Sequence, residues 1–219
     1  MARSILVAGN ESVLMSAITG EIQKKVEKYA VALIQNQVQY VDIEPADFGK
    51  GRIPVAWNPG SPLSGRTLII TAENRLGRIS DAVLVCSPPA MYRTPEALTP
   101  SEIDNQINNQ IKSWLYLIRE LAIYFRAKGS GSIALIMPDT NGSETQVDLL
   151  GASAAGSFRA VAQELLNSAA VEPFQIMGFS FSEAGQEKEF AAWSCKIIEE
   201  GSKKNSGKWH KFGKFGLFK

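Results

Sequence analysis

The sequence predicts an α/β fold: a doubly wound, mostly parallel sheet with helices on both faces. The continuous apolar run Ile133–Met137 is typical of a strand buried on both faces, and a polar loop and a helix from about Leu150 follow it. A similar strand, turn and helix start the chain at Ile5–Gly9. Strands that alternate with helices favour a parallel sheet. At 219 residues and 45% hydrophobic content, we expect residues 1–219 to form one domain.

The first helix follows the turn Gly9-Asn10-Glu11-Ser12. Its apolar residues recur at spacings of three and four, which places them on one face; they are Val13, Leu14, Ala17, Ile18 and Ile22. In dinucleotide-binding folds, the turn at this place approaches the pyrophosphate.

The next part of the chain predicts strands at Tyr29–Ile34 and Gln39–Ile43. Residues 44–65 are rich in Pro and Gly, and we expect an irregular edge there. For Arg66–Ala72 the local composition favours a strand, but a helix is also compatible. A carboxylate that could hold an adenosine ribose is not obvious; Asp42 is a candidate but comes late.

A long helix is predicted from Ser101, a cap residue after Pro100, to about residue 126. One apolar stripe runs along it, formed by Ile103, Ile107, Ile111, Leu115, Ile118, Ala122 and Phe125. Trp114, Leu117 and Leu121 widen this surface beyond one face. Such a wide surface indicates either an interface with another subunit or a helix buried in the monomer.

Three more elements complete the predicted fold: a strand at Phe174–Phe181, a helix at Glu187–Glu199 and a last strand from Gly207. The segment from Lys196 to the end holds seven Lys and two Glu, interleaved with aromatic residues. That pattern could suit an anionic surface or nucleic acid. We favour a strand and tail whose aromatic side chains pack inward or against a partner subunit, and therefore expect no nucleic-acid partner.

The composition limits the remaining classes of site. Cys86 and Cys195 lie far apart in apolar surroundings, which favours buried free thiols in a reducing compartment and no metal site. No apolar run is long enough for a membrane span or a signal sequence. We therefore expect a cytoplasmic protein that does not enter the membrane.

Two segments resemble the short-chain dehydrogenase/reductase family. LGRISDAVLVC at Leu76–Cys86 is similar to the family's turn into its fourth strand, and KGSGSIALI at Lys128–Ile136 to the run into its fifth. The resemblance extends in order over essentially the whole chain. It implies a Rossmann-like fold and, in the family, oxidoreductase chemistry with NAD or NADP.

The residues that perform this chemistry in the family are absent. Its Ser falls on Met137 or Pro138, and its Tyr-x-x-x-Lys on Leu150 and Ala154 or, shifted by one, Gly151 and Ala155. The reaction needs a phenol as general acid/base, an ammonium that lowers the phenol pKa, and a hydroxyl on the substrate carbonyl. The family's catalytic Asn falls on Gln110, beside Asn108 and Asn109, which we interpret as polar surface.

The family's cofactor motifs are also changed. Of its three turn glycines only Gly9 remains, with Val13 and Met15 in place of the others and Glu11 adding negative charge. Ser87-Pro88-Pro89 replaces the family's Asn-Ala-Gly. The candidate cleft consists of Gly9, Asn10, Glu11, Ser12, Ser87 and Pro88. A helix N-terminus can still attract an anion, but we expect no tight binding of NAD(P).

Three hypotheses follow. The first is a non-catalytic homologue acting as a scaffold or partner subunit, either a homodimer or homotetramer through helices 103–126 and 150–167 or a hetero-oligomer with an active relative. Its interface would place Trp114 and Leu117 opposite the small residues Ala152, Ala155 and Gly156. The alternatives are an NAD(P)-dependent oxidoreductase with a divergent site, and a protein that binds another small ligand in the vacated cleft.

Overall fold

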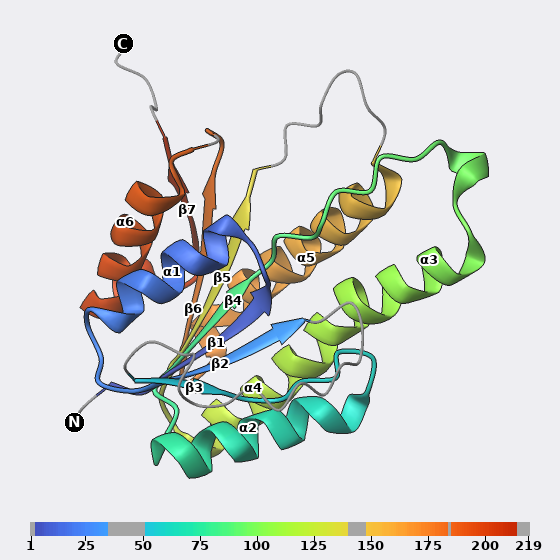
Figure 1. Ribbon diagram of the computed structural model, residues 1–219. Helices are drawn as coiled ribbons and strands as arrows, with labels where there is room; N and C mark the ends of the chain where they lie inside the picture. The colour runs from blue at the N-terminus through green and yellow to red at the C-terminus, as the bar shows by residue number, and fades with distance from the viewer. Residues whose placement is uncertain (1–2, 35–50, 140–147, 184, 214–219) are drawn as a thin grey trace, which may run out of the picture.

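The computed structural model describes residues 3–34, 51–139, 148–183 and 185–213. It contains a seven-stranded sheet in the order β3-β2-β1-β4-β5-β6-β7 (Figure 1). All neighbouring strands in it are parallel. The strands are β1 Ile5–Asn10, β2 Tyr29–Ile34, β3 Arg52–Pro54, β4 Asp81–Val85, β5 Ser132–Pro138, β6 Gln175–Phe181 and β7 Lys208–Phe212. The predicted α/β fold with a doubly wound parallel sheet is therefore confirmed.

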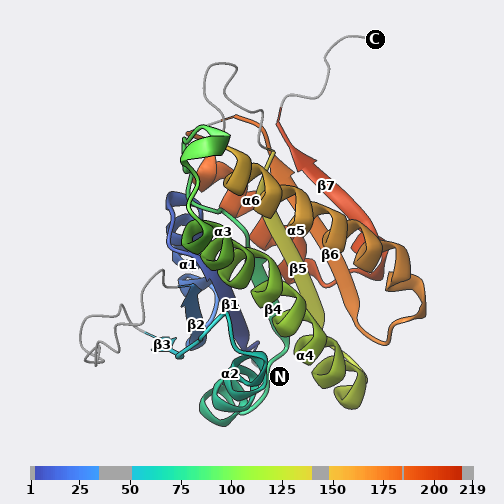
Figure 2. The same ribbon diagram turned by 90° about the vertical axis from the view of Figure 1, so that its right-hand side faces the viewer.

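Helices cover both faces of this sheet. They are α1 Val13–Gln23, α2 Pro62–Leu76, α3 Pro100–Gln106, α4 Ser113–Lys128, α5 Leu149–Ser168 and α6 Glu187–Glu200. A π-helical segment, Ile107–Lys112, joins α3 to α4. Short 3₁₀ turns lie at Pro95–Ala97, Ala169–Val171 and Lys203–Asn205. Helices α2, α4 and α5 lie on one face, and α1 and α6 on the other (Figures 1 and 2).

The sheet separates two apolar layers because alternate strand residues point to opposite faces. Leu6 and Ala8 of β1 pack in the layer under α2, α4 and α5, whereas Ile5 and Val7 pack in the layer under α1 and α6. Each large side chain that is fully buried stabilises the fold by roughly 1.5–3 kcal/mol. The strands that the sequence predicts as buried on both faces therefore hold the fold together.

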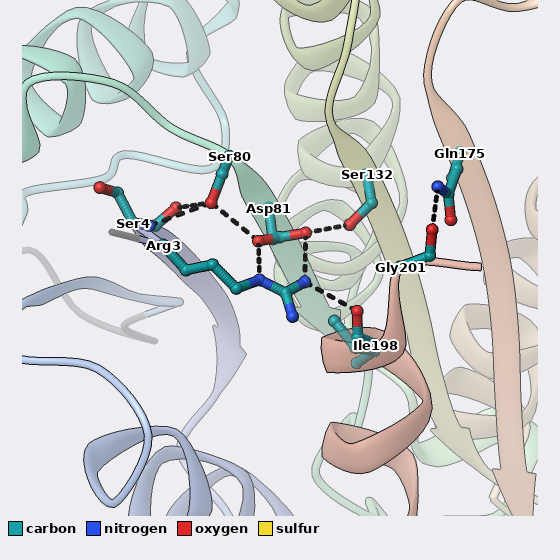
Figure 3. A network of polar contacts seen from close by, with 8 residues as sticks. All are labelled: Arg3, Ser4, Ser80, Asp81, Ser132, Gln175, Ile198 and Gly201. Carbon is teal, nitrogen blue, oxygen red and sulfur yellow. Dashed lines mark hydrogen bonds and ion pairs between the residues drawn. The ribbon is translucent and has the colours of Figure 1, made fainter. Parts of the chain in front are cut away.

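The amino ends of the central strands carry a polar network (Figure 3). Asp81, buried at the start of β4, accepts two hydrogen bonds of 2.9 Å from the guanidinium of Arg3. The hydroxyls of Ser80 and Ser132 donate to the same carboxylate at 2.8 and 2.6 Å. Arg3 also donates to the carbonyl of Ile198 in α6 at 2.7 Å. The network ties β1, β4, β5 and α6 together at one edge of the sheet.

The structure settles the undecided segment Arg66–Ala72, which belongs to helix α2. Pro62 stands in the first turn of α2, where a missing N–H is tolerated, and Leu68, Ile69 and Ala72 are buried at helical spacing. The prediction of an irregular edge is wrong in part, since residues 51–65 contain β3 and the start of α2. The predicted strand Gln39–Ile43, Asp42 and the loop around Asn141 lie outside the described residues.

The long predicted helix buries a partly different set of residues from the apolar stripe that the sequence indicates. Trp114 and Leu117 are buried in the core, with Trp114 only 1% exposed, whereas Leu115 is 46% exposed. Ile103 and Ile107 are likewise exposed, whereas Ile118 and Phe125, later in the predicted stripe, are buried. The predicted stripe therefore coincides with the buried face only in its second half. The ring of Trp114 packs edge-on against two other aromatic rings, and this contact sets which face lies inward. The prediction that Trp114 and Leu117 form an intersubunit surface is therefore wrong.

The last predicted strand is confirmed as β7, the edge strand beside β6. Its aromatic side chains Trp209 and Phe212 are partly buried, while Lys208 and Lys211 are exposed. His210 stacks on Phe179 with ring centroids 5.1 Å apart. Trp209 packs in the layer under α2, α4 and α5, and Phe212 in the layer under α1 and α6, as expected for strand residues three apart.

Candidate functional site

The candidate site lies where β1 and β4 end side by side. In open parallel sheets, ligands bind at the carboxyl ends of the strands where the strand order reverses. Here β1 pairs with β2 on one side and β4 on the other. Gly9 lies at the end of β1, and a Cβ at Gly9 would come within 2.4 Å of the carbonyl oxygen of Val85. The close approach of β1 to β4 therefore suffices to explain this glycine.

Asn10 joins the two strands to the long helix. Its Oδ1 accepts a hydrogen bond from the backbone N–H of Ser87 at 3.3 Å, and its Nδ2 donates to Oε1 of Gln110 at 3.0 Å. Both amide side chains are buried. The interpretation of Gln110 as polar surface is therefore wrong, because Gln110 points into the site from the π-helical segment.

The turn into α1 is satisfied by its own residues. Ser12 caps the helix, its hydroxyl accepting from the N–H of Met15 at 3.1 Å. Val13 is 71% exposed, whereas Met15 is buried in the layer under α1. Glu11 is exposed and Pro88 partly buried. Since Ser12 already occupies one N–H of the first turn, this helix N-terminus offers an anion fewer free donors than the sequence indicates.

The positions that the family resemblance assigns to catalysis on α5 are buried and apolar. Leu150, Gly151, Ala154 and Ala155 all face inward. The carbonyl of Leu150 accepts a hydrogen bond of 3.2 Å from Nε2 of Gln106. A Cβ at Gly151 would come within 2.1 Å of Asp148, the residue that caps α5. In either register, the described side chains at these positions offer no acid, base or hydroxyl.

Two further positions complete the family's catalytic set. Met137 is buried near the end of β5, and Pro138, which ends the strand, is partly buried. Ser153, the nearby hydroxyl on α5, is exposed on the outer face of the helix. None of the three brings a hydroxyl to the carboxyl end of β5.

A Tyr-x-x-x-Lys sequence does occur in the chain, at Tyr124 and Lys128, and the sequence analysis overlooked it. The structure places it in the last turn of α4, at the amino edge of the sheet. The phenol donates to Glu73 and accepts from the N–H of Ile79, each at 3.0 Å. Burial, with a contribution from the Glu73 carboxylate, raises the pKa of Tyr124, the opposite of what general base catalysis needs. Lys128 forms an ion pair with Glu73 at 2.7 Å. The cluster therefore has a structural role.

Four side chains contact one another at the carboxyl ends of β5 and β6. None of them was predicted as a site residue. Trp209 donates from its indole to the hydroxyl of Ser180 at 2.8 Å, and that hydroxyl donates to Asp139 at 2.9 Å. Arg159 forms an ion pair with Asp139 and lies over the Trp209 ring, 5.0 Å from its centroid. The charges of Arg159 and Asp139 are paired with each other. The contacts of this cluster hold β7 and α5 against the sheet.

The thiols and a small cavity beside Cys195 carry no comparable chemistry. Burial raises the pKa of Cys195 to about 12 and also raises that of Cys86, so both thiols stay protonated at neutral pH. A cavity of about 30 Å³ beside Cys195, between α1 and α6, has room for only one or two waters. Among the described residues, no three metal-ligating side chains come together. None of the described helices has the length and apolar character to cross a membrane.

Comparisons with known proteins place this geometry in a known fold. No protein-family model matches the sequence. No curated protein matches it either. The structure is similar to a short-chain dehydrogenase from Mycobacterium smegmatis, with TM-score 0.73 and 18% identity over 97% of this chain and 92% of the other.

Two more solved structures give the same result. A short-chain type dehydrogenase/reductase from Mycobacterium marinum has TM-score 0.75 and 13% identity, covering 95% of this chain and 93% of its own. A short-chain dehydrogenase/reductase from Serratia marcescens has TM-score 0.70 and 12% identity, covering 96% of each chain. The chain therefore has the Rossmann-like fold of short-chain dehydrogenase/reductase structures along nearly its whole length.

Proposed function

We propose that this protein is a non-catalytic relative of the short-chain dehydrogenases/reductases that acts as a partner subunit. The observation that carries the proposal is the buried face of α5, where Leu150 and Ala154, or Gly151 and Ala155, stand in the places of a phenol and an ammonium. Proton transfer to a carbonyl needs a group that can hold and release a proton near neutral pH. Aliphatic side chains cannot do this in either register.

The turn at the end of β1 supports the same proposal. The branched side chain of Val13 stands where the family has a glycine, and Val13 is 71% exposed. Asn10 is already engaged by Ser87 and Gln110, so its amide is not free for a ligand. NAD(P) is therefore not part of the proposed function.

The outward face of α3 and α4 supports a role as a subunit. It presents Ile103, Ile107, Leu115 and Ile123 as exposed large apolar side chains. On α5, the residues Ala152 and Gly156 are exposed and small, so another backbone could approach closely there. We propose a homodimer or homotetramer through this face. The alternative is a hetero-oligomer with an active relative. These residues replace Trp114 and Leu117 as the proposed contacts.

Solution mass tests the subunit proposal. Light scattering after size exclusion should give a dimer or tetramer for the wild type and a monomer for Leu115→Glu, because a charge in a dry interface is costly. Val13→Glu is the matched control: Val13 is 71% exposed and lies at the start of α1, which covers the opposite face of the sheet. Its mass should equal that of the wild type. A wild type that is monomeric and has no protein partner in a native pull-down contradicts the proposal.

A calorimetric titration tests the loss of cofactor. NADH and NADPH should each bind with a dissociation constant weaker than about 1 mM, which corresponds to about 4 kcal/mol. A micromolar constant would instead favour the alternative of an NAD(P)-dependent oxidoreductase with a divergent site. The two tests are independent, since loss of cofactor binding does not depend on assembly.

A further inference from the structure

Two buried N–H groups on the long helix have no hydrogen-bond partner among the described residues. They are Nε2 of Gln110 and Nε1 of Trp114. Each side chain is only 1% exposed. Leaving such a donor unpaired in the protein interior costs about 1–3 kcal/mol, so each of the two groups requires an acceptor.

The two donors lie on the same face of the helix. Gln110 stands in the π-helical segment and Trp114 in the first turn of α4, four residues later. Side chains three and four apart on a helix are neighbours, with about 5–6 Å between their Cβ atoms. One small acceptor can therefore lie between them. A π-helical turn inside a longer helix is also frequent at functional sites.

Neither donor can turn toward solvent. The other end of the Gln110 amide is held because its Oε1 accepts from Asn10. The Trp114 ring is held between Trp57 and Phe158, with ring centroids 5.7 and 5.1 Å away. The hydrogen-bonding and ring partners of the pair are thus an amide and two aromatic rings, all neutral. A buried anion without a paired cation is strongly unfavourable, which argues for a neutral acceptor.

We propose that Gln110 Nε2 and Trp114 Nε1 together bind one neutral acceptor oxygen, supplied by a buried water or by a carbonyl group of a small ligand. The oxygen continues a chain of hydrogen bonds that runs from Ser87 through Asn10 to Gln110 and on to Trp114. This chain joins the ends of β1 and β4 to the long helix at its π-helical turn. The inference is independent of the proposed function, since a subunit and an enzyme could both hold such an oxygen.

Nuclear magnetic resonance of the ¹⁵N-labelled full chain tests the proposal. The sequence has four Trp, so four indole N–H signals are expected, and the one missing in Trp114→Phe belongs to Trp114. If water supplies the oxygen, that signal shows a cross-peak to a long-lived water. If a ligand supplies it, the water cross-peak is missing, organic extraction releases a carbonyl compound, and the signal shifts after extraction. The indole of Trp209, satisfied by Ser180, should show neither effect.

Two variants test whether the oxygen is shared. Gln110→Met removes one donor, and the cross-peak or ligand shift of Trp114 should fall to background. Gln106→Met is the matched control, because Gln106 is also a buried glutamine of this helix but donates to the carbonyl of Leu150. It should leave the Trp114 signal unchanged. A signal that survives in Gln110→Met overturns the shared site.

A high-resolution crystal structure of the wild type is the second measurement, for the case that Gln110→Met does not fold. It should show one density peak within hydrogen-bond distance of both nitrogen atoms. A wild type with neither a water cross-peak nor an extractable ligand, and with no such peak, overturns the proposal.

Discussion

The sheet buries different kinds of polar group at the amino ends of its strands (the amino edge) and at their carboxyl ends (the carboxyl edge). At the amino edge a carboxylate, Asp81, accepts hydrogen bonds from Arg3, Ser80 and Ser132 (Figure 3). At the carboxyl edge, where ligands bind in such folds, the buried groups beside β1 and β4 are the neutral amides of Asn10 and Gln110. Among the described residues, no buried charge therefore lies beside the carboxyl ends of β1 and β4. This difference agrees with the proposal of a non-catalytic subunit.

The largest expected effect comes from a charge placed in the core beside the carboxyl edge. Trp114→Glu removes the ring between Trp57 and Phe158 and buries a carboxylate. We expect a loss of about 4 kcal/mol or more in the free energy of unfolding, which is enough to unfold many domains. Urea denaturation followed by circular dichroism measures it. Leu115→Glu, one residue further and exposed, should unfold within about 0.5 kcal/mol of the wild type when both are measured at a protein concentration at which they are monomers. An equal loss in both variants would refute the assignment of faces.

The next effect tests the amino edge. Asp81→Ala removes the carboxylate that accepts from Ser80, Ser132 and the guanidinium of Arg3. Ser80 and Arg3 keep carbonyl acceptors, but the Arg3 charge loses its counter-ion. Removing one partner of a buried pair costs 3–5 kcal/mol, and since the Arg3 side chain is partly exposed we expect about 3 kcal/mol. Asp104→Ala, at an exposed position of α3, is the control and should cost less than about 0.5 kcal/mol. If Asp81→Ala behaves like the control, the network does not hold this edge together.

A smaller effect is expected from the neutral pair at the carboxyl edge. Asn10→Ala removes the acceptor of Ser87 N–H and the donor to Gln110. Neutral hydrogen bonds contribute less than charged ones, and we expect a loss of about 1–2 kcal/mol. The same urea experiment measures it. A loss larger than that of Asp81→Ala would reverse the comparison between the two edges.

The strands and their order along the chain could be predicted because their apolar runs are continuous. Ile133–Met137 and Phe174–Phe181 are buried almost throughout, and helix α6 matches its predicted range to within a residue. For α2 the local composition was ambiguous, because branched residues such as Ile69 and Ile70 favour strands in isolation. The burial of Leu68, Ile69 and Ala72 against the core stabilises the helix instead.

The candidate site was less predictable, because contacts between distant residues determine it. Gln110 and Asn10 are a hundred positions apart, and no local pattern indicates that they bond. The π-helical segment adds a residue to one turn, so the regular stripe from Ile103 starts on the exposed side and reaches the buried face only at Ile118 and Phe125. The motif at Tyr124 and Lys128 has the family's spacing but lies at the opposite edge of the sheet. Spacing alone therefore does not identify a catalytic pair.

The smallest expected effect is on activity, where two added functional groups should produce none. Leu150→Tyr supplies a phenol that titrates near 10, so at neutral pH it is a poor base. Ala154→Lys, added to it, would bring an ammonium to a position that is fully buried, where desolvation lowers the Lys pKa and favours the uncharged amine. An uncharged amine lowers the phenol pKa little. Placing Tyr at Gly151 instead would clash with Asp148, the cap of α5.

Reductase activity of the single and double variants, followed by NADPH absorbance with a generic carbonyl substrate, should therefore equal the background of the wild type. Met137 still supplies no hydroxyl at the end of β5, and Val13 still stands at the cofactor turn. Circular dichroism of each variant shows whether it is folded, so that inactivity is not a trivial result of unfolding. A folded Leu150→Tyr variant with turnover above background would mean that the site binds cofactor and substrate and lacks only its acid. In that case the carboxyl ends of β1 and β4 would form a catalytic site with one residue missing. The lack of catalytic side chains would then no longer support the proposal of a non-catalytic subunit.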